Sequence, residues 1–212
     1  MTETGATDPA GRAHDLLRSR RSVRWYRPEP IPAEILDRIL TSAARAPSAH
    51  NRQPWRYLVL KGPGGKDALA RTMGVRLAED RRRDGDADAA IRDDVERSYR
   101  RIVGAAAVVV VALTLDPMDR YPDAARSRAE YLMAVQSTAM ATQNLLLAAH
   151  AEGLGACWMC APLFCQSDVR TILEMPDDWE PQGLITIGYG AGEARPPRPR
   201  LAVSEFVRFN AV

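Results

Sequence analysis

Hydrophobic side chains change their spacing several times along the chain, and each pattern predicts a different element. Residues 32–46 place apolar side chains at helical spacing, and Pro47 ends this helix because the residue before a proline avoids helical angles. Residues 55–61 are rich in aromatic and β-branched side chains, which favour a strand. The continuous apolar run at 105–115 has the length of a strand and predicts one that is buried on both faces.

Apolar positions in the C-terminal half predict the remaining buried elements. Residues 129–152 are apolar on more than one side, which is typical of a helix that is covered on most sides. We therefore expect a central helix partly covered by a second subunit, with an ordinary core helix of a monomer as the alternative. The other expected elements are short, namely strands at 156–159 and 183–190 and helices at 12–19 and 164–173.

The segment 66–101 differs from the rest of the chain because charged side chains of both signs dominate it. No strand pattern interrupts these charges, so we expect two surface helices that break near Asp84 and Gly85. A loop is expected just before them, at 62–65, because three glycines and a proline follow one another there.

The composition is that of a globular protein and excludes several classes. At 212 residues, the chain is long enough for one domain with a sizeable core, and its net charge of +2 lacks the basic excess of nucleic-acid-binding proteins. No apolar run reaches the roughly 20 residues that a membrane span needs. The polar N-terminus is unlike a signal peptide, so we expect residues 1–14 to be flexible and the protein to be cytoplasmic.

The three cysteines, Cys157, Cys160 and Cys165, lie close together, and the first two have the C-x2-C spacing of some metal and redox sites. A structural zinc site needs four ligands, whereas the sequence has no second cysteine pair and its three histidines are scattered. We therefore expect no metal, and interpret these residues as pocket or core thiols in a reducing cytoplasm.

Two polar clusters are candidates for ligand binding. The first places Arg20, Arg21, Ser22 and Arg24 within five residues, and its guanidiniums suit a phosphate or a carbonyl-rich ring edge. The second is the loop 47–53, in which short polar side chains are held between prolines. The alternatives are a solvated basic patch for the first cluster and a plain helix-to-strand connection for the second.

Together the two clusters, RRSVRWY at 20–26 and APSAHNRQPW at 46–55, resemble the entry signature of the nitroreductase family of FMN-dependent oxidoreductases. The resemblance implies a single FMN-binding domain at 15–212 with an α+β fold, in which helices flank a mixed, mostly antiparallel sheet. It also implies an intertwined homodimer that holds FMN non-covalently at the subunit interface. In this family, the region matching 66–101 often forms a lid over the active site.

The same resemblance implies a role toward FMN for each candidate residue. Arg20, Arg21 and Ser22 match contacts to the phosphate and the ribityl chain, and Arg24 matches a basic residue at the pyrimidine edge. The remaining implied contacts are Pro47, Ser48 and Ala49 from the neighbouring subunit with Asn51 and Gln53 just behind them, Cys157, Trp158 and Met159 near N5, Arg198 and Arg200 at the phosphate, and either Lys66 or Arg71 at the pyrimidine edge.

A finer resemblance, to the reductase domain of the coenzyme F420 biosynthesis enzyme, comes from the C-terminal half. It is carried by QNLLL at 143–147, HAEGLG at 150–155 and LEMPDDWEP at 173–181. It implies reduction of the dehydro precursor of coenzyme F420 (dehydro-F420-0) by reduced FMN, with Asp80 near the deazaflavin. The alternatives are a broad-specificity nitroreductase or quinone reductase that uses NAD(P)H, and a protein that holds flavin without turnover.

Overall fold

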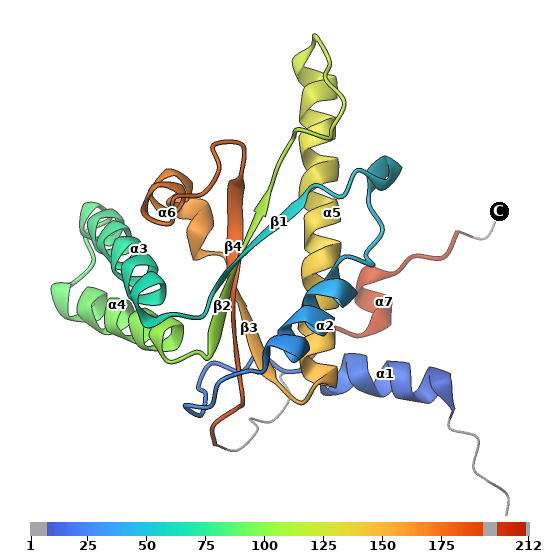
Figure 1. Cartoon of the computed structure of the whole chain (residues 1–212). Coiled ribbons are helices and arrows are strands. Elements are labelled where there is room, and N and C mark those ends of the chain that lie inside the picture. Colours follow the sequence, from blue (N-terminus) through green and yellow to red (C-terminus); the bar gives the residue numbers. More distant parts are fainter. Residues whose placement is uncertain (1–7, 193–198, 211–212) are drawn as a thin grey trace, which may run out of the picture.

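The fold is built around one antiparallel sheet, and the structure, a computed structural model, describes residues 8–192 and 199–210. The sheet contains β1 (Trp55–Leu60), β2 (Ala107–Leu113), β3 (Gly155–Met159) and β4 (Glu180–Gly188). β2 pairs with β1 and β4, and β3 pairs with the other side of β4, so the strand order is β1-β2-β4-β3. This order places β1 and β3 at the two edges (Figure 1).

The central strand β2 explains the long apolar run in the sequence, because all seven of its residues are buried. Val109 and Val111 face one hydrophobic cluster, and Val108 and Val110 face another on the opposite side of the sheet. The expected doubly buried strand is confirmed. Helices cover the two faces: α2 (Ala33–Ala43) and α5 (Ala124–Ala151) on one, and α3 (Pro63–Arg83), α4 (Asp88–Val103) and α6 (Gln166–Ile172) on the other.

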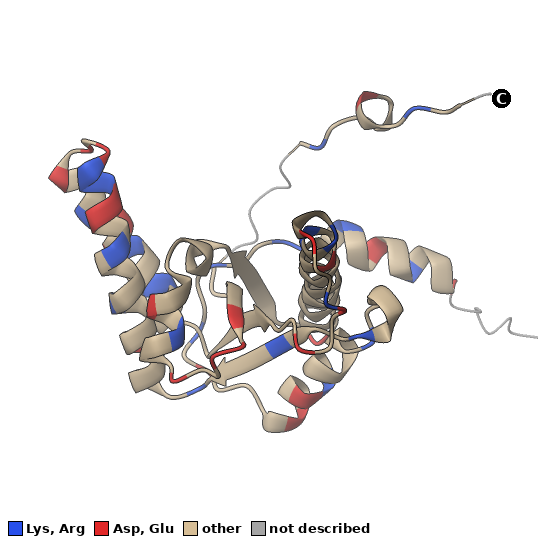
Figure 2. Cartoon of the chain, turned by 90° about the horizontal axis from the view of Figure 1, so that it is seen from above, with Lys and Arg blue, Asp and Glu red and all other residues tan. Residues whose placement is uncertain are grey.

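The charged segment forms the α3–α4 hairpin, with the expected break between Arg83 and Asp88. Figure 2 shows both signs of charge along it, and its arginines pair with carboxylates such as Asp80 and Asp86. The expected loop at 62–65 is wrong, because α3 already begins at Pro63. Proline is tolerated at the first helical position, since the N–H that it lacks has no intrahelical partner there.

Helix α5 begins at Ala124, five residues before the expected start at residue 129. Asp123 is its N-cap, and the Asp123 carboxylate accepts a hydrogen bond of 2.9 Å from the backbone N–H of Arg126. Along the helix, Leu132 and Met140 are 41% and 40% exposed within the single chain. The second subunit that we expect to cover this helix stays a prediction.

The arginine-rich segment runs along the outer edge of β3. It follows α1 (Pro9–Ser19), which begins before the expected residue 12. The proposed division of the chain into a flexible N-terminus at 1–14 and a domain at 15–212 stays a prediction. Ser22 forms a parallel bridge with Ala156, and the N–H of Val23 donates to the carbonyl of Ala156 at 3.0 Å. The α+β class, with helices that flank an antiparallel sheet, is confirmed.

Three short helices were not expected from the sequence: η1 (Ala49–Asn51), η2 (Ala161–Phe164) and α7 (Val203–Phe206). They are three or four residues long, which is too short for a repeating apolar pattern to indicate a helix. None of the helices in the described residues is long and apolar enough to cross a membrane.

The two faces of α3 lead to a stability prediction, because Leu69 is 0% exposed and Val75 is 58% exposed on the same helix. Leu69→Ala should lower the free energy of unfolding by roughly 2–5 kcal/mol, since it leaves a cavity in the core. Val75→Ala is the matched control and should change it by less than about 0.5 kcal/mol. Urea unfolding measures both values, and equal losses would contradict the packing of α3 against the sheet.

Candidate functional site

The segment 20–26 is held close to β3 by the absence of a side chain at Gly155. A Cβ atom at Gly155 would lie 2.6 Å from the side chain of Val23, which is too close for any other residue. The Val23 side chain therefore packs toward β3 at this point. The sequence-predicted residues Ser22 and Arg24, on either side of Val23 in the chain, are both exposed.

Positive groups gather around the buried thiol of Cys157. Burial raises the pKa of this thiol, whereas the guanidiniums of Arg24, Arg101 and Arg20 lower it by stabilising the thiolate, and so does a hydrogen bond with Ser22. The three arginines thus act on the same thiol of the edge strand β3. The structure thus brings Arg20, Ser22, Arg24 and Cys157 together, and adds Arg101 from the last turn of α4.

Arg20 and Arg21 also lie near the C-terminal end of α5. The Oγ atom of Ser19 and the Nε2 atom of His150 are 2.8 Å apart. The pKa of His150 is lowered, first by partial burial and then by the charges of Arg20 and Arg21. A side-chain N–H of Arg21 donates to the carbonyl of Arg20 at 3.0 Å, so this guanidinium is turned toward its own backbone.

The loop 47–53 lies elsewhere on the same chain, against the middle of α5. The backbone N–H of Ala49 donates to the Oγ atom of Ser137 at 3.3 Å. Ser137 and His150 are thirteen residues apart in α5, which corresponds to about 20 Å along a helix. Within one chain, the loop and the arginine segment are therefore well separated, although the sequence predicts both at the cofactor.

Inside this loop, the polar side chains bind one another and shape the backbone. The hydroxyl of Ser48 accepts a hydrogen bond of 3.1 Å from the N–H of Gln53, and the Gln53 amide lies 3.3 Å from the Oδ1 atom of Asn51. Asn51 and Gln53 adopt left-handed angles, with φ of 55° and 49°. Few residues other than glycine adopt these angles, so the loop forms a defined turn, and its proposed contact with FMN stays a prediction. Pro47 is exposed at its start.

The remaining predicted FMN contacts in the C-terminal half lie in different surroundings. The indole N–H of Trp158 donates to the sulfur of Cys160 at 2.8 Å, and its ring covers Gly183, where a Cβ would lie 2.3 Å away. Met159 is half-buried on the face of α3 and α6, and Arg200 is exposed. Arg198 lies outside the described residues.

Three candidates on or near α3 are already engaged within the chain. Asp80 accepts hydrogen bonds from Arg76 at 2.9 Å and Arg83 at 3.0 Å, and its pKa is lowered, chiefly by the bond from Arg76. The buried amine of Lys66 donates to the carbonyl of Ala105 at 2.6 Å, and Arg71 pairs with Asp67 at 2.9 Å. Neither the choice between Lys66 and Arg71 nor a substrate role for Asp80 gains support from these contacts.

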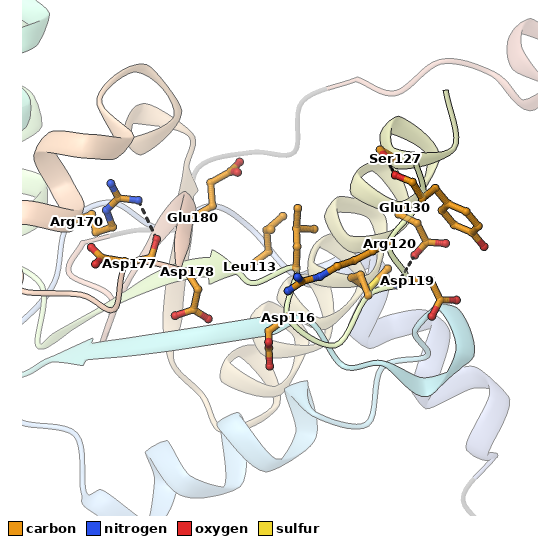
Figure 3. Close-up of a pocket in the computed structure, with 13 residues that line it drawn as sticks. Leu113, Asp116, Asp119, Arg120, Ser127, Glu130, Arg170, Asp177, Asp178 and Glu180 are labelled. Carbon is orange, nitrogen blue, oxygen red and sulfur yellow. Dashed lines mark hydrogen bonds between the residues drawn. The ribbon is translucent and has the colours of Figure 1, made fainter. Parts of the chain in front are cut away.

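A separate cavity of about 630 Å³ lies at the N-terminal end of α5 (Figure 3). Its charged lining residues are mostly acidic: Asp116, Asp119, Glu130, Asp177, Asp178 and Glu180, with Arg120 and Arg170. Several carboxylates already have partners, such as Asp178 with the hydroxyl of Thr114 at 2.7 Å. This lining disfavours an anionic ligand. No group of metal-ligating side chains occurs in the part of the chain that the structure describes.

Comparison with known proteins identifies the family of this chain. The model of the nitroreductase family matches residues 17–189, which is most of the sequence and includes both polar clusters. The chain belongs to the nitroreductase family. A relative from Methanothermobacter thermautotrophicus, provisionally named an NADH dehydrogenase/NAD(P)H nitroreductase, is 27% identical over 179 residues, or 84% of this chain and 76% of the relative.

Solved structures share the fold of this nitroreductase-family chain. The FMN-dependent nitroreductase NfnB from Mycobacterium smegmatis, solved with NADPH, has a TM-score of 0.75 at 24% identity and covers 96% of this chain and 100% of its own. A BluB-like flavoprotein from Clostridium difficile 630 has a TM-score of 0.76 at 19% identity, with 93% and 98% covered. At these identities, the likeness establishes the fold.

The partial burial of His150 and the nearby arginines predict a pH dependence of stability. Because the pKa of His150 is lower in the folded chain than in the unfolded one, the unfolded chain takes up this proton first as the pH falls below about 6.5. The free energy of unfolding should therefore decrease over that range, and His150→Gln should lose this part of the decrease. Urea unfolding between pH 8 and pH 5 measures it, with His14→Gln as the control. Parallel curves for wild type and His150→Gln would count against it.

Proposed function

We propose that this protein is an FMN-dependent reductase that oxidises NAD(P)H and reduces nitro or quinone compounds. The observation that carries the proposal is the convergence of Arg20, Ser22 and Arg24 beside Cys157 at the edge of β3, in a chain of the nitroreductase family. The names of similar proteins, which mention FMN, NADPH and nitroreductase activity, support the same reading.

The donor set at the β3 edge fits FMN, which combines a phosphate with a flat ring that has a polar edge. Guanidiniums match both the phosphate and the carbonyl-rich edge of the ring, because their planar donors form charge-assisted hydrogen bonds. Arg20, at the end of α1, would hold the phosphate, and Arg21 would join it by turning away from the backbone carbonyl that it contacts. Arg24 would hold the ring edge. When bound, FMN supplies the hydride-transfer chemistry, so the protein contributes binding, orientation and charge.

Positive charge near the ring edge has a chemical consequence for the proposed reaction. Reduction adds negative charge to the flavin ring, and a guanidinium at Arg24 favours the reduced form over the oxidised one. The half-buried Tyr26, two residues further on, fixes the segment, because its phenol oxygen lies 2.6 Å from the carbonyl of Val23 and 2.8 Å from the Oγ1 atom of Thr186. The chain thus holds the charge of Arg24 on a rigid support.

We further propose that a complete site needs two copies of the chain. The loop 47–53 contacts α5 about 20 Å from the helix end at which Arg20 and Arg21 lie, so one chain does not bring both clusters to one ligand. In a homodimer, the loop of one copy would complete the site of the other. The exposed apolar side chains of Leu132 and Met140 on α5 give the two copies a surface to share.

The residues that suggested the coenzyme F420 precursor as substrate have structural roles in this fold. Within the segment 173–181, Met175 is buried in the core and Trp179 packs against the same cluster. The carboxylate of Asp178 accepts the hydrogen bond from Thr114 that ties this segment to the end of β2. Such residues support a fold rather than a substrate, so we place the broad reductase reading first and keep dehydro-F420-0 reduction as the second hypothesis.

A turnover experiment tests the proposed function directly. The purified protein should bind FMN, NADH or NADPH should bleach the flavin absorbance without oxygen, and a nitroaromatic or a quinone should restore it at a catalytic rate. The same reduced protein is then mixed with dehydro-F420-0, and mass spectrometry follows a gain of two hydrogens. Turnover of that compound alone would favour the second hypothesis, and flavin that no nicotinamide reduces would favour a holding role.

A heterodimer experiment tests the shared site. Arg24→Ala should weaken FMN binding by roughly 1.5–3 kcal/mol, because it removes a charge-assisted hydrogen bond. Pro47→Glu should also impair binding, since it adds a carboxylate to the exposed loop that would reach the FMN site of the other subunit. Purified heterodimers of the two variants, carrying different tags, should hold one intact site per dimer if Arg24 and Pro47 act across the interface.

The opposite arrangement, in which each FMN site is formed by one chain, predicts a different result. If both residues act within one chain, every site of that heterodimer carries one defect and no FMN binds with wild-type affinity. A heterodimer of wild type with Arg24→Ala retains one intact site under either arrangement and is therefore the control. A monomer that binds FMN with full affinity would overturn the shared site as well.

A further inference from the structure

Arg101 contacts the arginine-rich segment 20–26, although it belongs to the charged segment 66–101. It lies in the last turn of α4, and its guanidinium carbon is 5.9 Å from the centre of the Trp25 ring. This distance is within the range of a cation–π contact. Trp25 directly follows Arg24, and its carbonyl accepts a hydrogen bond of 3.0 Å from the N–H of Ala191. The contact therefore joins α4 to the arginine segment at the β3 edge.

The end of α4 is fixed by the core, although the α3–α4 hairpin carries many exposed charges. Ile102, the next residue, is 1% exposed within the cluster that also contains Val108 of β2. By contrast, the side chain of Arg100 is 63% exposed and pairs with Glu96 at 2.6 Å, as is common on a solvated helix face. Arg101 thus belongs to the sheet edge, and Arg100 belongs to the surface.

We propose that Arg101 is a cofactor-binding residue, which acts with Arg24 on the ring edge of FMN that gains negative charge on reduction. This inference rests on the proposed function. It assigns the base of the hairpin, rather than a moving lid, to the cofactor site. The contact with Trp25, the residue that follows Arg24, favours the ring edge over the phosphate, because Arg20 and Arg21 lie toward the ends of α1 and α5. The effect of Arg101 on the Cys157 thiol, second among the charges after Arg24, agrees with this placement.

Flavin titrations of Arg101→Gln, Arg101→Lys and Arg100→Gln test the proposal. Arg101→Gln should raise the Kd for both FMN and riboflavin by roughly tenfold or more, as expected for the loss of a hydrogen bond to a charged group. The Arg101→Lys variant should recover part of the affinity, and the Arg100→Gln variant should stay within about twofold of wild type. The midpoint potential of bound FMN should fall in Arg101→Gln. A tenfold loss specific to the reduced form equals about 30 mV for two electrons.

The outcomes separate this inference from the proposed function. Wild type that binds no FMN would overturn both. Wild type that binds FMN, with an Arg101→Gln variant of unchanged Kd and potential, would overturn the inference alone. An effect on FMN that spares riboflavin and the potential would place the guanidinium at the phosphate and overturn the ring-edge assignment. The thermal midpoint of each flavin-free variant checks folding, and Trp25→Leu, which removes only the ring, should reproduce part of the effect.

Discussion

The rest of the structure depends on the burial of β2 on both faces. A strand whose seven residues are all buried needs apolar cover above and below, so α2 and α5 occupy one face while α3, α4 and α6 occupy the other. Both faces are then filled with side chains, and polar chemistry is left to the edges of the sheet. At one edge, β3 accepts the extended segment 20–26, and this placement brings the arginines to a defined surface.

That edge is held by contacts of very different kinds. Gly155 allows Val23 to approach the strand, and the phenol of Tyr26 reaches the buried Thr186 on β4. Burial raises the pKa of Tyr26 strongly, so the phenol stays neutral and keeps its hydrogen bonds at physiological pH. The side chains of Val23 and Tyr26 therefore fix the segment, while Arg24 is exposed. A rigid backbone that presents a guanidinium is a suitable platform for an anionic, flat ligand.

The sequence predicts those features that depend on local pattern, and it fails where distant contacts decide. Four consecutive valines at 108–111 were enough to predict β2, and the break near Gly85 was enough to separate α3 from α4. The expected start of α5 is too late for a local reason, because Asp123 is typical of loops as well as of N-caps, and its hydrogen bond from Arg126 shows that it is the cap. Arg101 could not be told from Arg100 by sequence, since the difference is the ring of Trp25 from another part of the chain.

Helix ends explain how several like charges can gather at this edge. Arg20 and Arg21 follow the C-terminus of α1 and lie near that of α5, and Arg101 belongs to the last turn of α4. The C-terminus of a helix carries partial negative charge, which offsets part of the repulsion among these guanidiniums. Arg24 lies in the extended segment rather than at a helix end, so a helix C-terminus compensates its charge less. Among the nearby charges, Arg24 favours the thiolate of Cys157 most, so its guanidinium acts on groups at this strand edge.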